Sequence, residues 1–419
     1  PAGFHIMDEG VDSGGVHVGI GAPVKIRIER GDDQSEGEIL GGQAGHAGLP
    51  VEAGGCVHQM VQGINRSVRV LPAASSSSSR AAYLVLGMHR SGTSAITQVL
   101  ALAGASLPEN VMPGDEHNAK GYFEPWRIAV FNDQRLRAAG GAWDDPFAYP
   151  YRSLDPREEK RWITRATDLF DEEFAGARHP LMKDPRVSVL GPLWRTVLND
   201  LRLPARAVIP VRHPLEVAGS LAKRDGFPVE KSVLLWTSYM LAAERYSRDT
   251  PRAIIPYEGL LSDWRTQVAR IEAAHGAPLP GLTPQAAKAI DGFLTSDLRH
   301  NAATQDLAAV PHVGALASQV YEWFVAAAQD QPRPIEALDE AGQRLEEMGQ
   351  AIGVFVSPVT SDLAAARADL LEARQVLAFE QSKLSALEIR LATHAAQIED
   401  HLRLEQTVGD LLDDLLGER

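Results

Sequence analysis

The sequence has little cysteine, little positive charge and no long hydrophobic run, and each shortage excludes a class of protein. Its single cysteine, Cys56, excludes a disulfide scaffold and a zinc site built from several cysteines. Lysine and arginine number 41 against 55 aspartates and glutamates, and the resulting charge of −14 disfavours nonspecific nucleic-acid binding. Without an apolar run of about 18 residues or an apolar leader, we expect no membrane span and a cytoplasmic location.

The 419 residues suffice for several structural units, and the composition changes along them. Residues 1–80 hold fifteen of the 36 glycines and end in a run of serines, which predicts a flexible or disordered extension. Residues 81–300 carry the alternating strand and helix patterns of one domain. We expect residues 301–357 to form helices packed on that domain, and residues 358–419 to form one long helix.

Short apolar runs alternate with helical patterns through the central domain. The run at 83–86 ends at Gly87 and precedes a helical pattern over 93–102; further strands are expected at 180–182, 205–211 and 253–257. Helical stretches separate them, at 215–223, 229–247 and 264–274. This alternation predicts an α/β fold of three layers, with a central parallel sheet covered on both faces.

The C-terminal part reads as helix, with patterns at 313–328 and 334–348, the second ending at Gly349. Beyond it, one heptad position is apolar throughout: Leu363, Leu370, Leu377, Leu384, Leu391 and Ile398. This spacing favours a coiled coil that forms a homodimer or docks a partner protein. Because the second seam position is only half apolar, a helix folding back on the core stays an equal alternative.

Residues 87–94, GMHRSGTS, stand between a predicted strand and a predicted helix. Two glycines with four residues between them let backbone N–H groups converge, and the helix N-terminus favours an anion there. The position after Gly92 holds Thr93 where a nucleotide triphosphatase has lysine, and the nearest cation is Arg90. We find no strand ending in a convincing magnesium ligand, so we expect a phosphate-like donor handled without a metal.

A second anion site is predicted where the strand at 205–211 ends. Arg212 leaves the carboxyl end of that strand, where ligands bind in open α/β sheets. Pro214 suits the first turn of the following helix, which places Ser220 within reach of the same crevice. An arginine and a hydroxyl together would hold a second phosphate through charge-assisted hydrogen bonds.

These two motifs, GMHRSGTS at 87–94 and VRHPLEVAGSLAKR at 211–224, resemble those of sulfotransferases that use 3′-phosphoadenosine 5′-phosphosulfate (PAPS). The likeness covers about 81–300, includes LMKDPR at 181–186 and IIPYEGLL at 254–261, and is greatest to bacterial and tyrosylprotein enzymes. It implies that the first motif holds the 5′-phosphosulfate and the second the 3′-phosphate. The late Arg-Lys-Gly motif of the small-molecule branch is absent, and Arg299 or His300 is the candidate to replace its adenine and rim contacts.

The resemblance also implies roles in sulfuryl transfer for particular side chains. Arg90, with Ser91, Gly92, Thr93 and Ser94, would bind the 5′-phosphosulfate. Glu124 is the candidate base, since aromatic neighbours and Pro125 would partly desolvate its carboxylate and make it more basic. Lys183 would lie near the transferring group. Rival bases are His89, Asp115, Glu116 and His117.

The sequence therefore favours a metal-independent PAPS-dependent sulfotransferase acting on a hydroxyl of a carbohydrate, a lipid or a small metabolite. A nucleotide kinase or other phosphoryl transferase with an altered loop is the second interpretation, and magnesium dependence would favour it. A non-catalytic scaffold that recruits partners through the C-terminal helix is the third.

Overall fold

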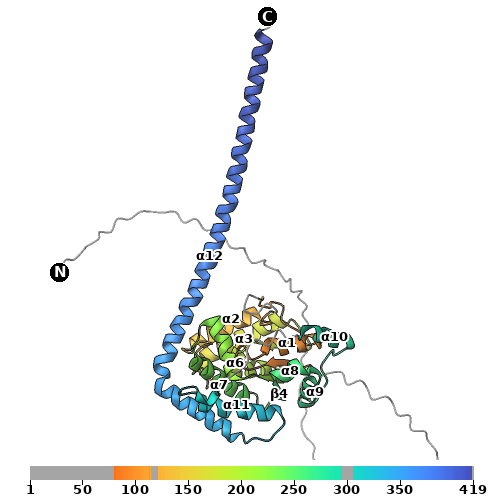
Figure 1. Cartoon of the computed structure of the whole chain (residues 1–419), viewed down its shortest axis with the longest axis vertical. Coiled ribbons are helices and arrows are strands. Elements are labelled where there is room, and N and C mark those ends of the chain that lie inside the picture. Colours follow the sequence, from red (N-terminus) through yellow and green to blue (C-terminus); the bar gives the residue numbers. More distant parts are fainter. Residues whose placement is uncertain (1–79, 113, 115–120, 295–304, 418–419) are drawn as a thin grey trace, which may run out of the picture. The chain divides into compact units, whose positions relative to one another are not determined.

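The computed structural model describes residues 80–112, 114, 121–294 and 305–417. The extension expected at 1–80 lies outside the described residues except for Arg80. The domain is α/β, as predicted, with a four-stranded sheet among many helices (Figure 1).

All neighbouring strands of the sheet are parallel, in the order β2-β1-β3-β4. The strands are β1 (Ala82–Val85), β2 (Leu181–Lys183), β3 (Ala205–Val211) and β4 (Arg252–Pro256). The chain leaves β1 towards β2 on one side and later adds β3 on the other. The carboxyl ends of β1 and β3 therefore flank the switch point of the topology, where open α/β sheets bind ligands.

Alternate side chains of the strands enter two separate hydrophobic clusters, one on each face of the sheet. Leu84 and Ile209 belong to the first cluster, whereas Tyr83 and Val208 belong to the second. Strands buried on both faces are expected when helices cover a parallel sheet on each side, so the architecture has the three predicted layers.

The helices of the sheet domain were predicted in part. Four helices confirm the expected helical stretches to within a few residues: α1 (Thr93–Leu102), α6 (Pro214–Asp225), α7 (Val229–Tyr246) and α9 (Trp264–His275). The remaining helices of this part are α2 (Trp126–Ala138), α3 (Pro156–Phe174), α4 (Arg186–Val189), α5 (Gly191–Asp200), α8 (Tyr257–Ser262) and α10 (Pro284–Phe293).

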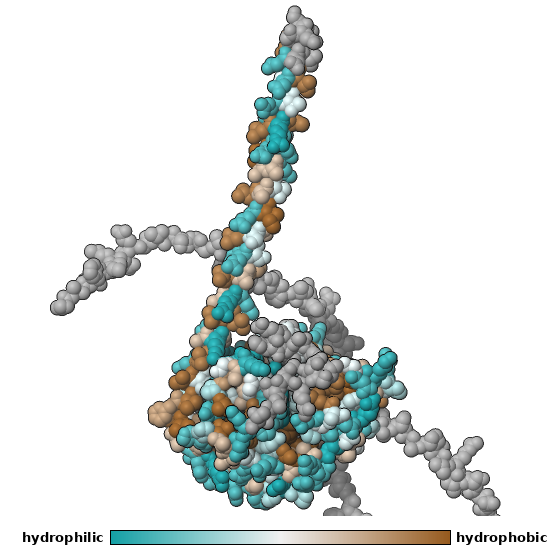
Figure 2. All heavy atoms as spheres, in the orientation of Figure 1, coloured by the Kyte–Doolittle hydropathy of each residue, from teal (hydrophilic) through white to brown (hydrophobic). Residues whose placement is uncertain are grey.

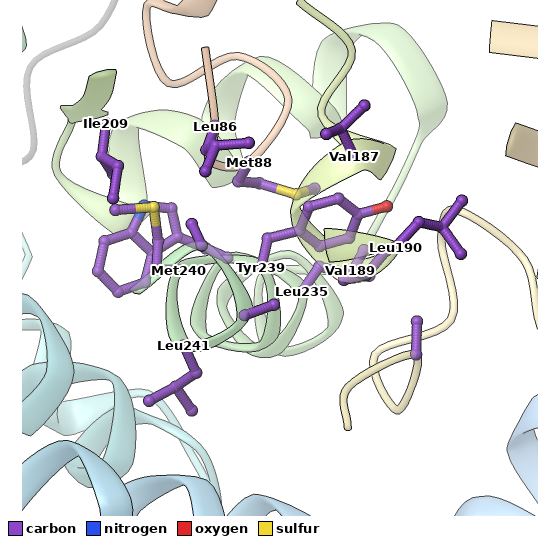
Figure 3. Packing of buried hydrophobic residues seen from close by; sticks show 14 of the residues in the cluster. Leu86, Met88, Val187, Val189, Leu190, Ile209, Leu235, Tyr239, Met240 and Leu241 are labelled. Atoms are coloured by element: carbon purple, nitrogen blue, oxygen red, sulfur yellow. The ribbon is translucent and has the colours of Figure 1, made fainter. Parts of the chain in front are cut away.

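The first cluster fixes the base of the loop that follows β1. Leu86 and Met88 lie beside Tyr239 and Met240 of α7 (Figure 3). Full burial of such side chains stabilises a fold by about 1.5–3 kcal/mol each. The glycine between them, Gly87, approaches Met240 closely, since a Cβ there would lie 3.5 Å from the Met240 sulfur. The loop thus starts from a rigid support.

The C-terminal part comprises the 3-10 helix η2 (Leu307–Ala309), α11 (Gly314–Ala328) and α12 (Glu336–Gly417). Helix α11 confirms the helical pattern at 313–328. The predicted stop at Gly349 is wrong, because α12 continues through it. Gly349 instead permits close packing, since a Cβ there would lie 3.2 Å from the Phe147 ring. The boundary expected at 357/358 falls inside this continuous helix.

Helix α12 packs on the domain only through its N-terminal part. Leu338, Ala341 and Leu345 belong to the first hydrophobic cluster, whereas the described side chains beyond Ala366 are exposed. Beyond that residue no described side chain of the helix is buried, although Arg367 lies 3.5 Å from Asp144. None of the helices in the described ranges combines the length and the hydrophobicity needed to cross a bilayer.

Candidate functional site

The loop between β1 and α1 has a backbone that only particular residues can adopt. Gly92 has φ 89° and Arg90 has φ 66°, both in the left-handed region. A Cβ at Gly92 would lie 2.2 Å from Tyr257 Cδ2, so the close approach as well as the dihedral requires glycine. Gly92 precedes the first turn of α1, which has no side-chain cap among the described residues. The first N–H groups of α1 are thus available to an anion.

Two contacts from other elements hold this loop. The Gly87 N–H donates to Ser188 Oγ at 2.8 Å, and Arg212 Nη1 donates to the Arg90 carbonyl oxygen at 3.2 Å. The second contact stabilises the left-handed backbone at Arg90, a conformation that costs about 1–3 kcal/mol and is concentrated at functional sites. Ser188 was not among the residues expected from the sequence.

The two predicted anion sites adjoin each other. Arg90 Nε donates to Ser220 Oγ at 2.7 Å, which joins the loop after β1 to the helix after β3. Burial, together with the nearby charges of Arg224 and Arg212, lowers the pKa of Arg90 from its ordinary value. An anion bound between these arginines would relieve that repulsion.

Arg212 is buried and three of its contacts fix the guanidinium. Its Nε donates to Glu216 Oε2 at 2.9 Å, its Nη1 donates to the loop carbonyl, and its Cζ lies 4.9 Å from the centre of the Tyr257 ring. The buried Arg212 Nη2 and Ser91 Oγ have no hydrogen-bond partner within the described part of the chain. Since buried polar groups are nearly always paired, these two atoms are candidates to donate to an acceptor such as a phosphate oxygen.

Lys183 connects the end of β2 to the segment before α2 and to α1. Its Nζ donates to Glu124 Oε1 at 2.6 Å, to the Tyr122 carbonyl oxygen at 2.9 Å and to Ser94 Oγ at 3.4 Å. The lysine and the glutamate are both almost fully buried. The predicted desolvation of Glu124 is therefore present, but its carboxylate is paired with a cation instead of standing among aromatic side chains alone.

A second buried arginine supports this pair. Arg186 Nη1 lies 3.7 Å from Glu124 Oε2 and 2.8 Å from Asp184 Oδ1, and its Nε donates to Asp133 Oδ1 at 2.7 Å. Although burial opposes its charge, Asp133, Asp184 and Glu124 hold the pKa of Arg186 well above its ordinary value. Asp184 also accepts from Asn132 Nδ2 at 2.7 Å. Asp184 thus orients Arg186.

Both carboxylate oxygens of Asp184 accept hydrogen bonds from protein groups, which leaves them engaged with partners other than a metal ion. Its Oδ2 is occupied by Asn132 and its Oδ1 by both the side chain and the backbone N–H of Arg186. In the described ranges, no group of three or more histidine, cysteine or acidic side chains has an arrangement that fits a metal ion.

His89, the rival base inside the loop, lies in an apolar environment. Its ring centre is 4.8 Å from that of Trp143 and 6.0 Å from that of Tyr239. Burial, reinforced by Arg186 and the other nearby cations, lowers the pKa of His89 well below 6.5. The histidine is therefore neutral and packs beneath the loop. The other rivals, Asp115, Glu116 and His117, and the suggested adenine contacts Arg299 and His300 lie outside the described residues.

The predicted site residues that the structure describes thus lie at or after the carboxyl ends of β1, β2 and β3, or contact residues that do. Arg90, Arg212 and Ser220 form one group, while Ser94, Glu124 and Lys183 form another. The loop at 87–94 belongs to both groups, and Ser91 and Thr93 are buried within it. The residues that sequence reasoning missed are Ser188, Asn132 and Asp133, which support the site from α4 and α2.

Comparison with solved structures gives a remote similarity. No protein-family model and no curated protein matches the sequence. Among solved structures, the chain is similar to the sulfotransferase domain of an olefin synthase from Synechococcus PCC 7002, with a TM-score of 0.35 and 15% sequence identity. The similarity covers 60% of this chain and 97% of that domain.

Proposed function

We propose that this protein transfers a sulfuryl group from PAPS to an acceptor hydroxyl. The observation that carries the proposal is the contact between the two predicted anion sites at the β1/β3 switch point, through the 2.7 Å hydrogen bond that Arg90 donates to Ser220. A donor with phosphates at both its 3′ and 5′ positions needs two adjoining anion sites, and this contact supports that assignment.

The residues present fit such a donor. Arg212 Nη2 and Ser220 Oγ would hold the 3′-phosphate, since the first atom is buried without a described partner and the second is a hydroxyl in contact with Arg90. The first N–H groups of α1, with Arg90 and Ser91 Oγ, would hold the 5′-phosphosulfate. The carbohydrate, lipid or small metabolite expected as acceptor is part of this proposal.

Lys183 would stabilise the charge on the leaving phosphate, and Glu124 would accept the proton of the acceptor hydroxyl. When the donor's anion is in place, it competes with Glu124 for the Lys183 ammonium, which then stabilises the bridging oxygen of the leaving phosphate. Glu124, released from the lysine, accepts the proton of the acceptor hydroxyl. The acceptor oxygen forms the new bond to sulfur, the bond from sulfur to the bridging oxygen breaks, and 3′,5′-bisphosphoadenosine leaves with the electron pair.

The test compares nucleotides on the purified full-length chain. We expect 3′,5′-bisphosphoadenosine without magnesium to raise the unfolding temperature more than ATP with magnesium at equal concentration, because binding to the folded state stabilises it. A larger effect of ATP that depends on magnesium would replace the proposal with a phosphoryl transferase. No shift with either nucleotide would contradict both.

A further inference from the structure

The distal part of α12 carries an apolar seam that the described parts of this chain leave uncovered. Leu363 is 44% exposed and Leu391 is 73% exposed, and the residues between them on the same heptad position lie within this range. Figure 2 shows hydrophobic residues recurring along this helix among hydrophilic ones. A long helix in water is stabilised mainly by packing of its apolar face, so this seam requires a second surface.

The heptad register indicates that the second surface is another helix with a matching seam. With Leu363 at position a, the a positions are apolar through Ile398, and Leu387 and Val408 add large apolar residues at position d. The two seam positions and their flanks, a, d, e and g, supply four contacting residues per heptad. Over the seven heptads from Leu363 this amounts to roughly 28 residues per copy, within the roughly 20–30 a side of a stable interface.

The flanking charges match those of a second copy of the same helix. In a parallel, in-register pair, position g of one helix faces position e of the next heptad on the other. This places Asp369 opposite Arg374 and Lys383 opposite Glu388, two pairs of opposite charge. The same rule places Asp362 opposite Arg367, which lies 3.5 Å from Asp144 within its own chain.

Each of these pairs occurs twice in a symmetric dimer, and no pair of like charges arises at g and e in the same alignment. Lys383 already contacts Glu380 of its own helix at 2.7 Å, which partly neutralises the carboxylate at that d position. We propose that residues 363–412 of α12 form a parallel, in-register coiled coil with the same residues of a second copy of this chain.

Cysteine cross-linking of the full-length protein tests the alignment. In a Cys56→Ser background, we expect Leu370→Cys and Ile398→Cys each to form a covalent dimer under mild oxidation. In this alignment each of these positions faces the same position of the second copy. An antiparallel pair brings at most one of these two positions together with itself. Gln375→Cys, at position f on the outer face, is the matched control and should stay monomeric on a denaturing gel.

Charge reversal tests the partner. Lys383→Glu places a carboxylate opposite Glu388 of the second copy, and Glu388→Lys places two lysines together. Each change replaces two attractions by two repulsions, so we expect the dimer dissociation constant to rise roughly ten- to thirty-fold. The double reversal should restore it to near the starting value. Sedimentation over a hundredfold range of concentration measures the constant, and circular dichroism confirms that the helix content is unchanged.

Three results would overturn the proposal. The first is a monomer at every concentration, and the second is cross-linking at only one of the two seam positions. The third is a dimer that neither charge reversal weakens, which would place the interface elsewhere on the chain.

Discussion

Replacing Arg212 by alanine should weaken binding of 3′,5′-bisphosphoadenosine far more than binding of adenosine 5′-monophosphate. Arg212 Nη2 has no hydrogen-bond partner within the described part of the chain, and its Nη1 holds the Arg90 carbonyl. A hydrogen bond to a charged group contributes about 1.5–3 kcal/mol, so loss of the guanidinium removes about 3 kcal/mol of interaction with a 3′-phosphate. That corresponds to an affinity loss of about 100-fold.

Two further substitutions separate charge from geometry at the same place. Arg212→Lys keeps a cation without the planar fork, and we expect it to recover about ten-fold of the lost affinity. Glu216→Gln removes the carboxylate that accepts from Arg212 Nε at 2.9 Å while retaining the arginine. This variant is the matched control, and its affinity for the bisphosphate should be unchanged or higher.

Titration calorimetry with both nucleotides on each variant measures the effect, and thermal unfolding checks that the variants remain folded. The decisive quantity is the ratio of the two affinities, since loss of the loop support at Arg90 would weaken both ligands alike. A ratio in Arg212→Ala equal to that of the unmodified protein would refute the assignment of the 3′-phosphate to this arginine.

Three more substitutions test the rest of the site. Glu124→Gln should leave nucleotide affinity within about three-fold and lower turnover at least 100-fold, as expected for loss of a general base, and a stopped assay with labelled PAPS measures it. Gly92→Ala should destabilise the fold by about 3 kcal/mol, because alanine is strained in this left-handed backbone and its Cβ would clash with Tyr257. Chemical denaturation measures this loss, and the double variant Gly92→Ala/Tyr257→Ala should recover only the part that is due to the clash. Because the pKa of His89 is lowered in the folded state, the unfolded chain binds its proton first as pH falls below 6.5. Stability should therefore decrease there by up to about 1.4 kcal/mol per pH unit for this group, and His89→Phe should flatten the denaturation profile between pH 6.5 and 5.

The strand and helix pattern near the site could be predicted because it depends on local signals. The strand Ala205–Val211 and the helix Thr93–Leu102 were predicted residue for residue, since an apolar run marks the strand and a helical apolar period marks the helix. The same reasoning gave a wrong helix end at Gly349. A glycine in a helical pattern is read as a stop, but here it allows Phe147 to approach α12, and contacts between distant residues leave no local signal.

The contact of Arg90, Arg212 and Ser220 could also be expected from sequence, because an arginine or a hydroxyl after a strand of a parallel sheet comes to the same edge of the sheet whatever its neighbours are. The supporting residues have no such rule. Asn132 and Asp133 lie in the middle of α2, and only the packing of that helix brings them to Asp184 and Arg186. A polar residue on a helix is by default a solvated one, so its buried role is set by the fold alone.

The pairing of Lys183 with Glu124 changes how the site has to work. From the sequence, each was assigned a separate task, and nothing in the spacing of positions 124 and 183 places their side chains 2.6 Å apart. Under the proposed function, the ion pair holds Glu124 until a donor anion takes its place at Lys183. Donor binding and release of the base would then be the same event. We therefore expect a donor to bind before an acceptor hydroxyl is deprotonated, and initial-rate kinetics showing an ordered sequence with the acceptor first would contradict that coupling.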